Sequence, residues 1–483
     1  MARIWMVSSE CSPWAKSGGL GDAVAALSGE LARTGDEVRV FVPGYASVRR
    51  EDFSHHDGYI SVPLGSHDEP AELRSLETPD GLIVTIVEAP AFFGRPGFYG
   101  EQGQDYPDND RRFAFFARAV TELAVRGRPD ILHVHDWQAA LVSFFARHVI
   151  PWPDRRPGIV LTIHNVGYQG SFPMSALGLL SIPWNEIESH LNGGPLEFYG
   201  TFNFLKAGIQ SADLVNTVSP AHASETLAPD LGFGLDGLLR HLGDRYRGIL
   251  NGIDQRAWNP ETGRFLAHHF SVDDLAGKGR LKQEVFDRFG LLGGERPPLI
   301  ALVSRLVWQK GIDVALEALG PAIQQGARLV ALGSGDPELE EGLRILERTF
   351  PGSVAVRIGF DENLSHLLIA AADMVLIPSR YEPCGLIQMQ AMRYGALPVA
   401  CRTGGLADTI TDLADYPDTG TGFLFSGPTA GALRHVLDRA LALYRTDPAA
   451  WTTAMRRAMR KDFSWGRSAA EYRGLYRRAL EMR

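Results

Sequence analysis

The sequence predicts an α/β protein with two Rossmann-like domains that face a central cleft. Strand-like apolar runs alternate with helix-like stretches along most of the chain, a pattern typical of parallel sheets covered by helices on both faces. The length of 483 residues suggests two or three domains. One glycine-rich pattern also occurs twice, as AKSGGLGD at residues 15–22 and as CRTGGLAD at residues 401–408.

The first half of the chain opens with the apolar run ARIWMVSSE, and further strand-like runs follow it. Two amphipathic stretches in this half predict helices, residues 108–127 and 139–150. The later strand-like runs are EVRVFVP (37–43), GLIVTIVEA (81–89), PDILHVHD (129–136), PGIVLTIHN (157–165) and ADLVNTVS (212–219).

The second half repeats this alternation, with helices predicted over residues 311–326 and 336–350. We expect an N-terminal domain over residues 1–245, a C-terminal domain over 246–463, and a final helix over 464–483 that packs back toward the N-terminal domain. The strand-like runs are YRGILNGID (246–254), PLIALVSRL (298–306), ARLVALGSG (327–335), VAVRIGF (354–360), ADMVLIPS (372–379) and LPVACRT (397–403).

Both glycine turns follow a strand-like run and open a helix-like one. Glycine lets the backbone turn sharply and approach a ligand, and a helix N-terminus favours anions. We therefore expect Gly18 and Gly19 in the first turn, and Thr403 and Gly404 in the second, to approach a phosphate, with Lys16 adding positive charge. A turn that only separates a strand from a helix would have the same composition.

Composition excludes several classes of protein. The formal net charge of −9 argues against a nucleic-acid binder. Three cysteines favour a reducing compartment over a disulfide framework. No run approaches the ~18 apolar residues that span a membrane, and the N-terminus lacks the features of a signal peptide. We expect a cytoplasmic protein with neither nucleic acid nor membrane as a partner.

Polar residues end two strands of the first half, where open α/β sheets bind ligands. His133, His135 and Asp136 in HVHDWQ could hold a metal ion, but no second His or Cys pair is near. A carboxylate at Asp136 and an indole at Trp137 suit a sugar better. His164 and Asn165, at the end of VLTI, either fill a turn or contact a substrate.

Strand ends of the second half carry charge. Arg305 and Lys310 in VSRLVWQKG supply the bidentate cation and the point charge that suit a diphosphate, although such a pair is often only solvated surface. Glu382 precedes Pro383, and we expect Cys384 and Gly385 to start a helix whose N–H groups face hydroxyls. Cys384 is either a reactive thiol or, as we prefer, a small residue packed close to the ligand.

Together, KSGGLGD, HDWQ, TIHNVGYQG, NGID, VSRLVWQKG, SRYEPCGLIQMQAM and RTGGLADT resemble the bacterial glycogen synthases and plant starch synthases. The resemblance runs from residue 3 to about residue 425, and the tail FSWGRSAAEYRGLYRRAL is similar to the family's closing helix. It implies a retaining glycosyltransferase of the GT-B type, which moves glucose from a nucleotide sugar, usually ADP-glucose, to an α-1,4-glucan. Ser17, where relatives often have Thr or Val, and Gln390, in place of a second acid, are departures that should change little.

The resemblance also implies roles for individual residues. The catalytic set would be Glu382, His164, Arg305, Lys310 and Asp136. Residues that bind the donor would be Lys16, Gly18, Gly19, Arg305, Lys310, Cys384, Gly385, Thr403 and Gly404, and residues that bind the acceptor would be Asp22, Asn165, Trp137 and Tyr168.

We expect no cofactor and no metal. The D-x-D at residues 108–110 precedes a helix, so it is interpreted as an N-cap cluster. No carboxylate is placed as a nucleophile, which favours same-face attack over double displacement. An NAD-dependent oxidoreductase should have G-x-G-x-x-G after its first strand, a glucan phosphorylase needs pyridoxal phosphate, and a non-catalytic glucan-binding module needs neither cation. A transferase with another nucleotide sugar or a smaller acceptor is the alternative closest to this interpretation.

Overall fold

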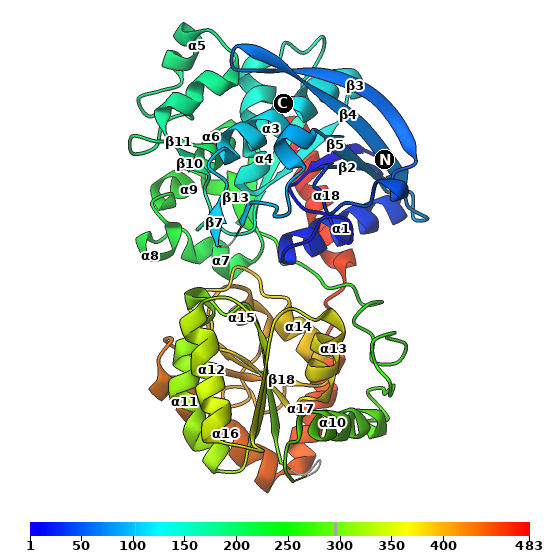
Figure 1. Cartoon of the computed structure of the whole chain (residues 1–483), viewed down its shortest axis with the longest axis vertical. Coiled ribbons are helices and arrows are strands. Elements are labelled where there is room, and N and C mark those ends of the chain that lie inside the picture. Colours follow the sequence, from blue (N-terminus) through cyan, green and yellow to red (C-terminus); the bar gives the residue numbers. More distant parts are fainter. Residues whose placement is uncertain (102, 294–296) are drawn as a thin grey trace. The chain divides into compact units, whose positions relative to one another are not determined.

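The computed structural model describes residues 1–101, 103–293 and 297–483, which form two compact units (Figure 1). Unit 1 comprises Met1–Gly252 and Trp465–Arg483, and unit 2 comprises Ile253–Ser464. The chain therefore enters unit 2 after Gly252 and returns to unit 1 for its last helix. In the described part of the chain, no helix has both the length and the apolar character needed to cross a membrane.

Unit 1 is built around one sheet with the strand order β13-β12-β9-β8-β1-β2-β5-β4-β3. From β13 to β5 the strands are parallel, and the apolar runs of the sequence form these buried strands. The strands of the sheet are β1 (Arg3–Val7), β2 (Glu37–Pro43), β3 (His55–Leu64), β4 (His67–Glu77), β5 (Ile83–Glu88), β8 (Ile131–His135), β9 (Gly158–Ile163), β12 (Leu214–Thr217) and β13 (Tyr246–Gly248). Two small ribbons pair β6 (Gly100–Glu101) with β7 (Gln104–Asp105), and β10 (Ser171–Phe172) with β11 (Phe202–Asn203).

The antiparallel hairpin of β3 and β4 is an element that the sequence pattern did not predict. It extends the edge of the sheet beyond β5. Polar and charged side chains run through both strands, and most residues of β3 are exposed or half-buried. An edge hairpin of this composition lacks the continuous apolar run by which the buried strands were identified.

The helices of unit 1 connect these strands and include the helix that ends the chain. They are α1 (Gly19–Arg33), α2 (Pro90–Phe93), α3 (Asn109–Gly127), α4 (Asp136–Phe144), α5 (Trp184–Ser189), α6 (Phe204–Ser211), α7 (Pro220–Glu225), α8 (Pro229–Gly232), α9 (Asp236–Leu242) and α18 (Trp465–Glu481). Single turns and short irregular helices lie at η1 (Arg50–Asp52), η2 (Phe145–Val149), η3 (Met174–Leu180) and η4 (Gly243–Arg245).

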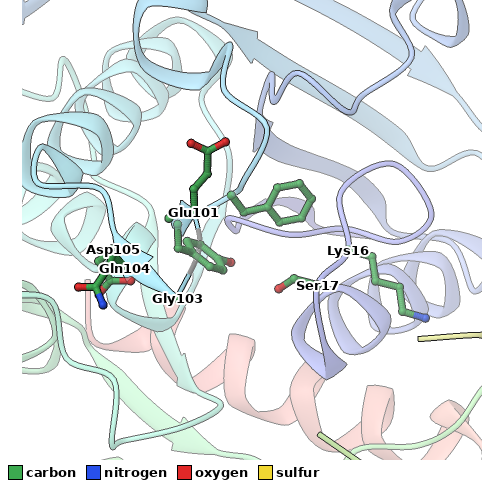
Figure 2. Close-up of a pocket in the computed structure, with 9 residues that line it drawn as sticks. Lys16, Ser17, Glu101, Gly103, Gln104 and Asp105 are labelled. Atoms are coloured by element: carbon green, nitrogen blue, oxygen red, sulfur yellow. The ribbon is translucent and has the colours of Figure 1, made fainter. Parts of the chain in front are cut away.

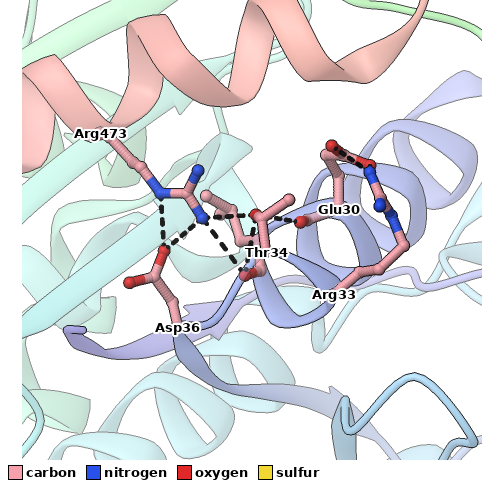
Figure 3. Close-up of polar contacts among 6 residues, drawn as sticks. Glu30, Arg33, Thr34, Asp36 and Arg473 are labelled. Atoms are coloured by element: carbon pink, nitrogen blue, oxygen red, sulfur yellow. Dashed lines mark hydrogen bonds and ion pairs between the residues drawn. The ribbon is translucent and has the colours of Figure 1, made fainter.

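Helix α18 packs into the core of unit 1. Its residues Tyr472 and Tyr476 are buried in the same hydrophobic cluster as strands β1, β8 and β9. At the surface, Arg473 donates through Nε to Asp36 Oδ2 at 2.8 Å, and its guanidinium also reaches Thr34 at the end of α1 (Figure 3). Apolar burial and this ion pair together fix the last helix on unit 1.

Unit 2 has a parallel sheet with the order β16-β15-β14-β17-β18-β19. This is the strand order 3-2-1-4-5-6 of a doubly wound fold, which binds ligands at the carboxyl edge where the order reverses. Its strands are β14 (Leu299–Val303), β15 (Arg328–Gly333), β16 (Val354–Ile358), β17 (Met374–Ile377), β18 (Leu397–Cys401) and β19 (Phe423–Phe425). Its helices are α10 (Ala276–Phe289), η5 (Trp308–Lys310), α11 (Ile312–Gln324), α12 (Pro337–Thr349), α13 (Glu362–Ala371), α14 (Ile387–Arg393), α15 (Gly404–Thr409), α16 (Ala430–Thr446) and α17 (Pro448–Met459).

The reversal points predict where each unit binds its ligand. In unit 2 the order reverses between β14 and β17, and in unit 1 it reverses between β1 and β8. The segments that follow these four strands begin at residues 304, 378, 8 and 136. They contain most of the residues that the sequence patterns singled out.

Candidate functional site

The loop after β1 is organised by a buried carboxylate. Glu10 is 3% exposed, and its Oε2 accepts from the backbone N–H groups of Ser17 at 2.7 Å and of Gly18 at 3.2 Å. Its Oε1 accepts from the Ser17 hydroxyl at 2.6 Å and from the Tyr99 hydroxyl at 2.7 Å. The N–H of Gly18 therefore already has an anionic partner within the protein.

This arrangement changes the interpretation of the first glycine turn. Gly18 has φ −163°, an extended conformation open to any residue, and a Cβ there would meet nothing within 4 Å. Gly19 is the first residue of α1. The sequence predicted two glycines that approach a phosphate, whereas the conformation of Gly18 does not demand glycine and its N–H group is bound to Glu10.

Lys16 lies on the same loop and is exposed. Its Nζ is 2.9 Å from Asp22 Oδ1 on α1, and the two side chains are 29% and 37% exposed. In Figure 2 the Lys16 side chain extends away from Glu101 and Asp105. A solvent-accessible ion pair of this kind contributes little stability, so a ligand phosphate could replace Asp22 as the partner of Lys16.

A pocket of about 460 Å³ lies beside this loop (Figure 2). Its far wall includes the half-buried Tyr99 and the β6–β7 ribbon, which no sequence pattern indicated. Burial raises the pKa of Tyr99 well above its usual value, and its hydroxyl is also 2.9 Å from Ser9 Oγ. The lining residues are Lys16, Ser17, Phe98, Tyr99, Gly100, Glu101, Gly103, Gln104 and Asp105.

The neighbouring strand β8 ends at a strained residue. Asp136 has φ +56°, in the left-handed region that a non-glycine residue rarely adopts. Its Oδ1 accepts from the N–H groups of His164 at 2.6 Å and of Asn165 at 3.4 Å. Burial raises the pKa of Asp136 to about 7, and those two N–H groups partly oppose the rise. The structure thus brings the three predicted residues together, with Asp136 holding the backbone of the other two.

His164 and Asn165 form the turn after β9. Asn165 Oδ1 accepts from the N–H of Gly167 at 3.0 Å, so this side chain also shapes the turn. The His164 side chain is partly exposed, and its Nε2 lies 3.1 Å from His135 Nδ1. Burial lowers the pKa of His164 to about 3, so this imidazole is neutral near neutral pH.

The two aromatic residues predicted to bind the acceptor lie in different environments. Trp137 is 9% exposed and packs against Phe113, Phe172 and Phe204, which is a core position in place of the open sugar platform we expected. Tyr168 is 54% exposed on the turn after Asn165. Only Tyr168 has a face free to stack on a sugar.

In unit 2, two of the predicted charges form a pair. Lys310 Nζ lies 2.5 Å from Glu382 Oε2, which also accepts from the Ser379 hydroxyl at 3.0 Å. Glu382 is 6% exposed. Arg305 is exposed at the end of β14, and no ion pair is found for it among the described residues. The pair and the open guanidinium occupy the two segments that meet at the reversal point.

The loop after Glu382 differs from the predicted helix start. Helix α14 begins at Ile387, three residues after Cys384, because Gly385 has φ +68° and cannot continue a right-handed helix. Cys384 is buried, in agreement with a packing residue. The fully buried Gln388 donates to the carbonyl groups of Cys384 at 3.0 Å and of Gly385 at 2.8 Å, which stabilises the loop.

The second glycine turn packs directly against this loop. Gly404 has φ +45°, and a Cβ there would lie 2.0 Å from the carbonyl oxygen of Glu382. Thr403 is buried at the N-cap of α15, although its side chain makes no cap hydrogen bond. Glycine at residue 404 is therefore required for the contact between the two segments.

Two alternatives from the sequence can be compared with this geometry. Within the described ranges, no three His, Cys, Asp or Glu side chains are grouped so as to hold a metal ion. His133 bonds Tyr476 and Thr162 instead. At the D-x-D, Asp108 occupies the N-cap of α3, but its carboxylate pairs with Arg95 at 2.6 Å and caps no N–H group.

Sequence reasoning missed Glu10, Tyr99, Ser379 and Gln388. Their positions offer partial signals, because Glu10 follows β1 and Ser379 follows β17 at the reversal points. Tyr99 is distant in sequence from the turn that it contacts, so no local pattern identifies it.

Comparison with known proteins agrees with this architecture. The model of the starch synthase catalytic domain matches residues 3–241, and that of the glycosyl transferases group 1 matches residues 285–458. The chain is 44% identical over 480 residues to a glycogen synthase of Myxococcus xanthus, with 98% of each chain covered. It is 39% identical over 497 residues to glycogen synthase 2 of Bradyrhizobium diazoefficiens, covering 100% of this chain and 99% of the relative.

Two solved structures are similar to this chain. The catalytic domain of starch synthase IV from Arabidopsis thaliana, bound to ADP and acarbose, matches with a TM-score of 0.92 and 34% identity over 99% of both chains. Sucrose-phosphate synthase from Thermosynechococcus elongatus, at 20% identity and a TM-score of 0.62 over 100% of both chains, shares the fold. These likenesses confirm the predicted fold class, two Rossmann-like units of the GT-B type. The chain belongs to the glycogen and starch synthase family of glycosyltransferases.

Proposed function

We propose that this chain transfers glucose from ADP-glucose to the non-reducing end of an α-1,4-glucan, with retention at the anomeric carbon. The observation that carries the proposal is the group of charges at the reversal point of unit 2. There Lys310 is 2.5 Å from Glu382, and Arg305 is exposed on the segment after β14 that also carries Lys310. A nucleoside diphosphate leaving group needs such cations, and a sugar hydroxyl needs such a carboxylate.

In this proposal the cations act on the leaving diphosphate. Arg305 binds it in a bidentate manner, while Lys310 turns from Glu382 to a phosphate oxygen. Glu382 then accepts from sugar hydroxyls and favours the positive charge that develops at the anomeric carbon, as in glycoside hydrolysis. Lys16 and the turn at Thr403 and Gly404 contribute further donor contacts.

Retention follows from same-face attack. The bond between the anomeric carbon and the diphosphate oxygen breaks, and the acceptor 4-hydroxyl forms its bond on the same face. The acceptor proton passes to the departing diphosphate oxygen, so no protein base is required. Asp136, a carboxyl of unit 1, already accepts from two backbone N–H groups, which suits a supporting role better than that of a nucleophile.

The proposal also covers partners and location. Asp22, Asn165, Tyr168 and His164 would face the sugars, and neither a metal nor a cofactor would be required. All three cysteines are buried, and a chain with so few cysteines suits a reducing cytoplasm.

The test is a donor panel of ADP-, UDP- and GDP-glucose with maltooligosaccharide acceptors, in which nucleotide release and chain length are both followed. We expect ADP-glucose to be preferred, elongation to be stoichiometric with ADP release, and EDTA to leave the rate unchanged. Equal use of UDP-glucose would overturn the base preference. Nucleotide release without elongation would make the enzyme a hydrolase, and a covalent glucosyl-enzyme would overturn same-face attack.

A further inference from the structure

A group of buried polar side chains in unit 1 lies beside the half-buried His164, and the proposed reaction assigns a role to His164 but to no other member of the group. It begins on α18 and crosses the sheet beneath the carboxyl edge. Its members are Tyr476, His133, Thr162, Asn216, His135 and His164.

The hydrogen bonds of this series fix the proton on His133. Asn216 Nδ2 lies 3.3 Å from the Thr217 carbonyl oxygen, so the other end of the amide, Oδ1, is an acceptor. Thr162 donates its only proton to that oxygen, at 2.8 Å. The same hydroxyl can therefore only accept from His133 Nε2, at 2.7 Å, and His133 Nδ1 accepts from the Tyr476 hydroxyl at 2.8 Å.

His135 lies between His133 and His164 and is 1% exposed. Its ring centroid is 4.2 Å from that of His133 and 5.3 Å from that of His164. Its Nδ1 is 3.1 Å from His164 Nε2, while its own Nε2 is buried with no hydrogen-bond partner among the described residues. Within the described part of the chain, the only hydrogen bond of this ring is therefore with His164.

All three imidazoles are neutral near neutral pH. Burial lowers the pKa of His133 and His164 to about 3, and it lowers the pKa of His135 well below its usual value. Each ring therefore carries one proton, and one ring of the His135–His164 pair donates to the other.

The unpartnered nitrogen decides which ring donates. If His164 donated, the proton of His135 would lie on Nε2, as a buried N–H group without an acceptor. Such orphaned donors are rarer and more costly than a lone pair left without a donor. His135 therefore donates from Nδ1, and the proton of His164 lies on Nδ1.

We propose that His135 is a positioning residue that holds His164 in the Nδ1-protonated tautomer. The Nδ1–H group of His164 can then donate a hydrogen bond to a hydroxyl of the sugar substrate. The inference rests on the proposed function, in which His164 faces the sugar. In the opposite tautomer this nitrogen would be an acceptor, and the orientation of the sugar hydroxyl would have to reverse.

The first experiment observes the proton directly. Ring-¹⁵N histidine is incorporated into the whole protein, and the two nitrogens of His164 are assigned from the signals lost in His164→Gln. In wild type we expect the shift of a protonated nitrogen at His164 Nδ1 and that of an unprotonated nitrogen at Nε2. A proton on Nε2 would overturn the proposal. This readout needs no substrate, so it does not depend on the donor panel that tests the function.

The second experiment separates positioning from packing. His135→Asn places an amide N–H close to the position of Nδ1, whereas His135→Leu fills the space without a donor. We expect His135→Leu to lower kcat about 10- to 100-fold, the scale for a misplaced contact group. His135→Asn should recover most of that loss, and the nitrogen shifts of His164 should change only in His135→Leu.

The matched control is Tyr476→Phe, which removes a buried hydrogen bond at the far end of the series and leaves the His135 donor in place. Its kcat should stay close to that of wild type. If Tyr476→Phe lost as much kcat as His135→Leu, or if His135→Asn and His135→Leu were equally active, His135 would be a packing residue only.

Discussion

The ammonium group of Lys310 and the carboxylate of Glu382 lie 2.5 Å apart at the reversal point of the unit 2 sheet. Each is the ionic partner of the other, and the Glu382 carboxylate is 6% exposed. Removing either charge therefore leaves the other partly buried and unpaired, a cost that does not apply to the exposed Arg305.

Arg305→Ala and Lys310→Ala should differ in stability while both lose activity. We expect each to lower kcat about 10²- to 10³-fold, the usual loss for one group that stabilises a transition state. Only Lys310→Ala should also lower the free energy of unfolding, by about 1–3 kcal/mol, because Glu382 loses its partner. Denaturant unfolding and initial rates measure the two effects. Arg348→Ala, which removes an exposed arginine paired with Glu341, is the control. Wild-type kcat in both site variants would exclude these cations from the site.

Glu382→Gln keeps the size of the side chain but removes its charge. Since we assign Glu382 to hydroxyls and to positive charge that grows toward the transition state, we expect a large fall in kcat and a smaller change in the KM for the donor. Steady-state kinetics over a range of donor concentrations separate the two. A change confined to KM would reassign Glu382 to ground-state binding.

The two glycine turns should respond differently to alanine. Gly18→Ala adds a Cβ that meets nothing within 4 Å in an extended conformation, so folding should be unaffected. Gly404→Ala requires φ +45° and places a Cβ 2.0 Å from the Glu382 carbonyl oxygen. We expect this variant to lose more than about 1 kcal/mol of stability and most of its activity. Thermal unfolding of Gly18→Ala and Gly404→Ala measures this difference in stability. Equal melting temperatures would contradict the distinct roles assigned to the two turns.

Glu10→Gln should loosen the loop that carries Lys16. The amide can no longer accept from Ser17, Gly18 and Tyr99 with a full charge, and hydrogen bonds to charged groups contribute about 1.5–3 kcal/mol. We expect a loss of stability on that scale and weaker donor binding. The control is Glu30→Gln on α1, which breaks only the exposed pair with Arg33 and should change stability by less than about 0.5 kcal/mol (Figure 3). A Glu10→Gln protein as stable as this control would remove Glu10 from the organisation of the loop.

The raised pKa of Asp136 predicts that the stability of the protein depends on pH in a specific way. Burial raises its pKa from 3.8 to about 7, so between about pH 4 and pH 7 the native state binds more protons here than the unfolded chain does. The contribution of this group to stability therefore falls as pH rises through that range. Asp136→Asn keeps an oxygen for the N–H groups of His164 and Asn165 but does not titrate. The free energy of unfolding of the variant, relative to wild type, should increase between pH 4 and pH 7 and then level off. A difference that is constant with pH would mean that this carboxyl titrates at its ordinary value.

Much of the fold follows from the sequence, because buried parallel strands are continuous apolar runs. The runs at β14, β17 and β18 were predicted for that reason, and the strand-end rule then drew attention to Arg305, Lys310 and Glu382. The β3–β4 hairpin was not predicted, because its polar residues form a sheet edge and contain no continuous apolar run. The predicted start of α14 was wrong by three residues because Gly385 adopts a left-handed φ of +68°, which interrupts the helix that the apolar spacing predicted.

Site geometry was less accessible from the sequence. Both glycine turns contain the same pattern, GGL-x-D, yet their contacts differ. Gly404 packs against the backbone of Glu382, whereas the N–H of Gly18 donates to the Glu10 carboxylate. The indole of Trp137, at a strand end, was expected to face a sugar, but three phenylalanines from other segments pack against it. These differences come from contacts between residues far apart in sequence, which spacing alone does not encode.

The return of the chain to unit 1 at Trp465 determines the order in which the protein can fold during synthesis. Unit 2 is complete once residue 464 has left the ribosome, whereas the core of unit 1 lacks Tyr472 and Tyr476 until residues 465–483 have followed. The earlier-synthesised unit is therefore the later one to finish. Until residues 465–483 emerge, His133 and Asn216 lack their hydroxyl partners on α18, and the nascent chain carries an open apolar seam for chaperones to cover.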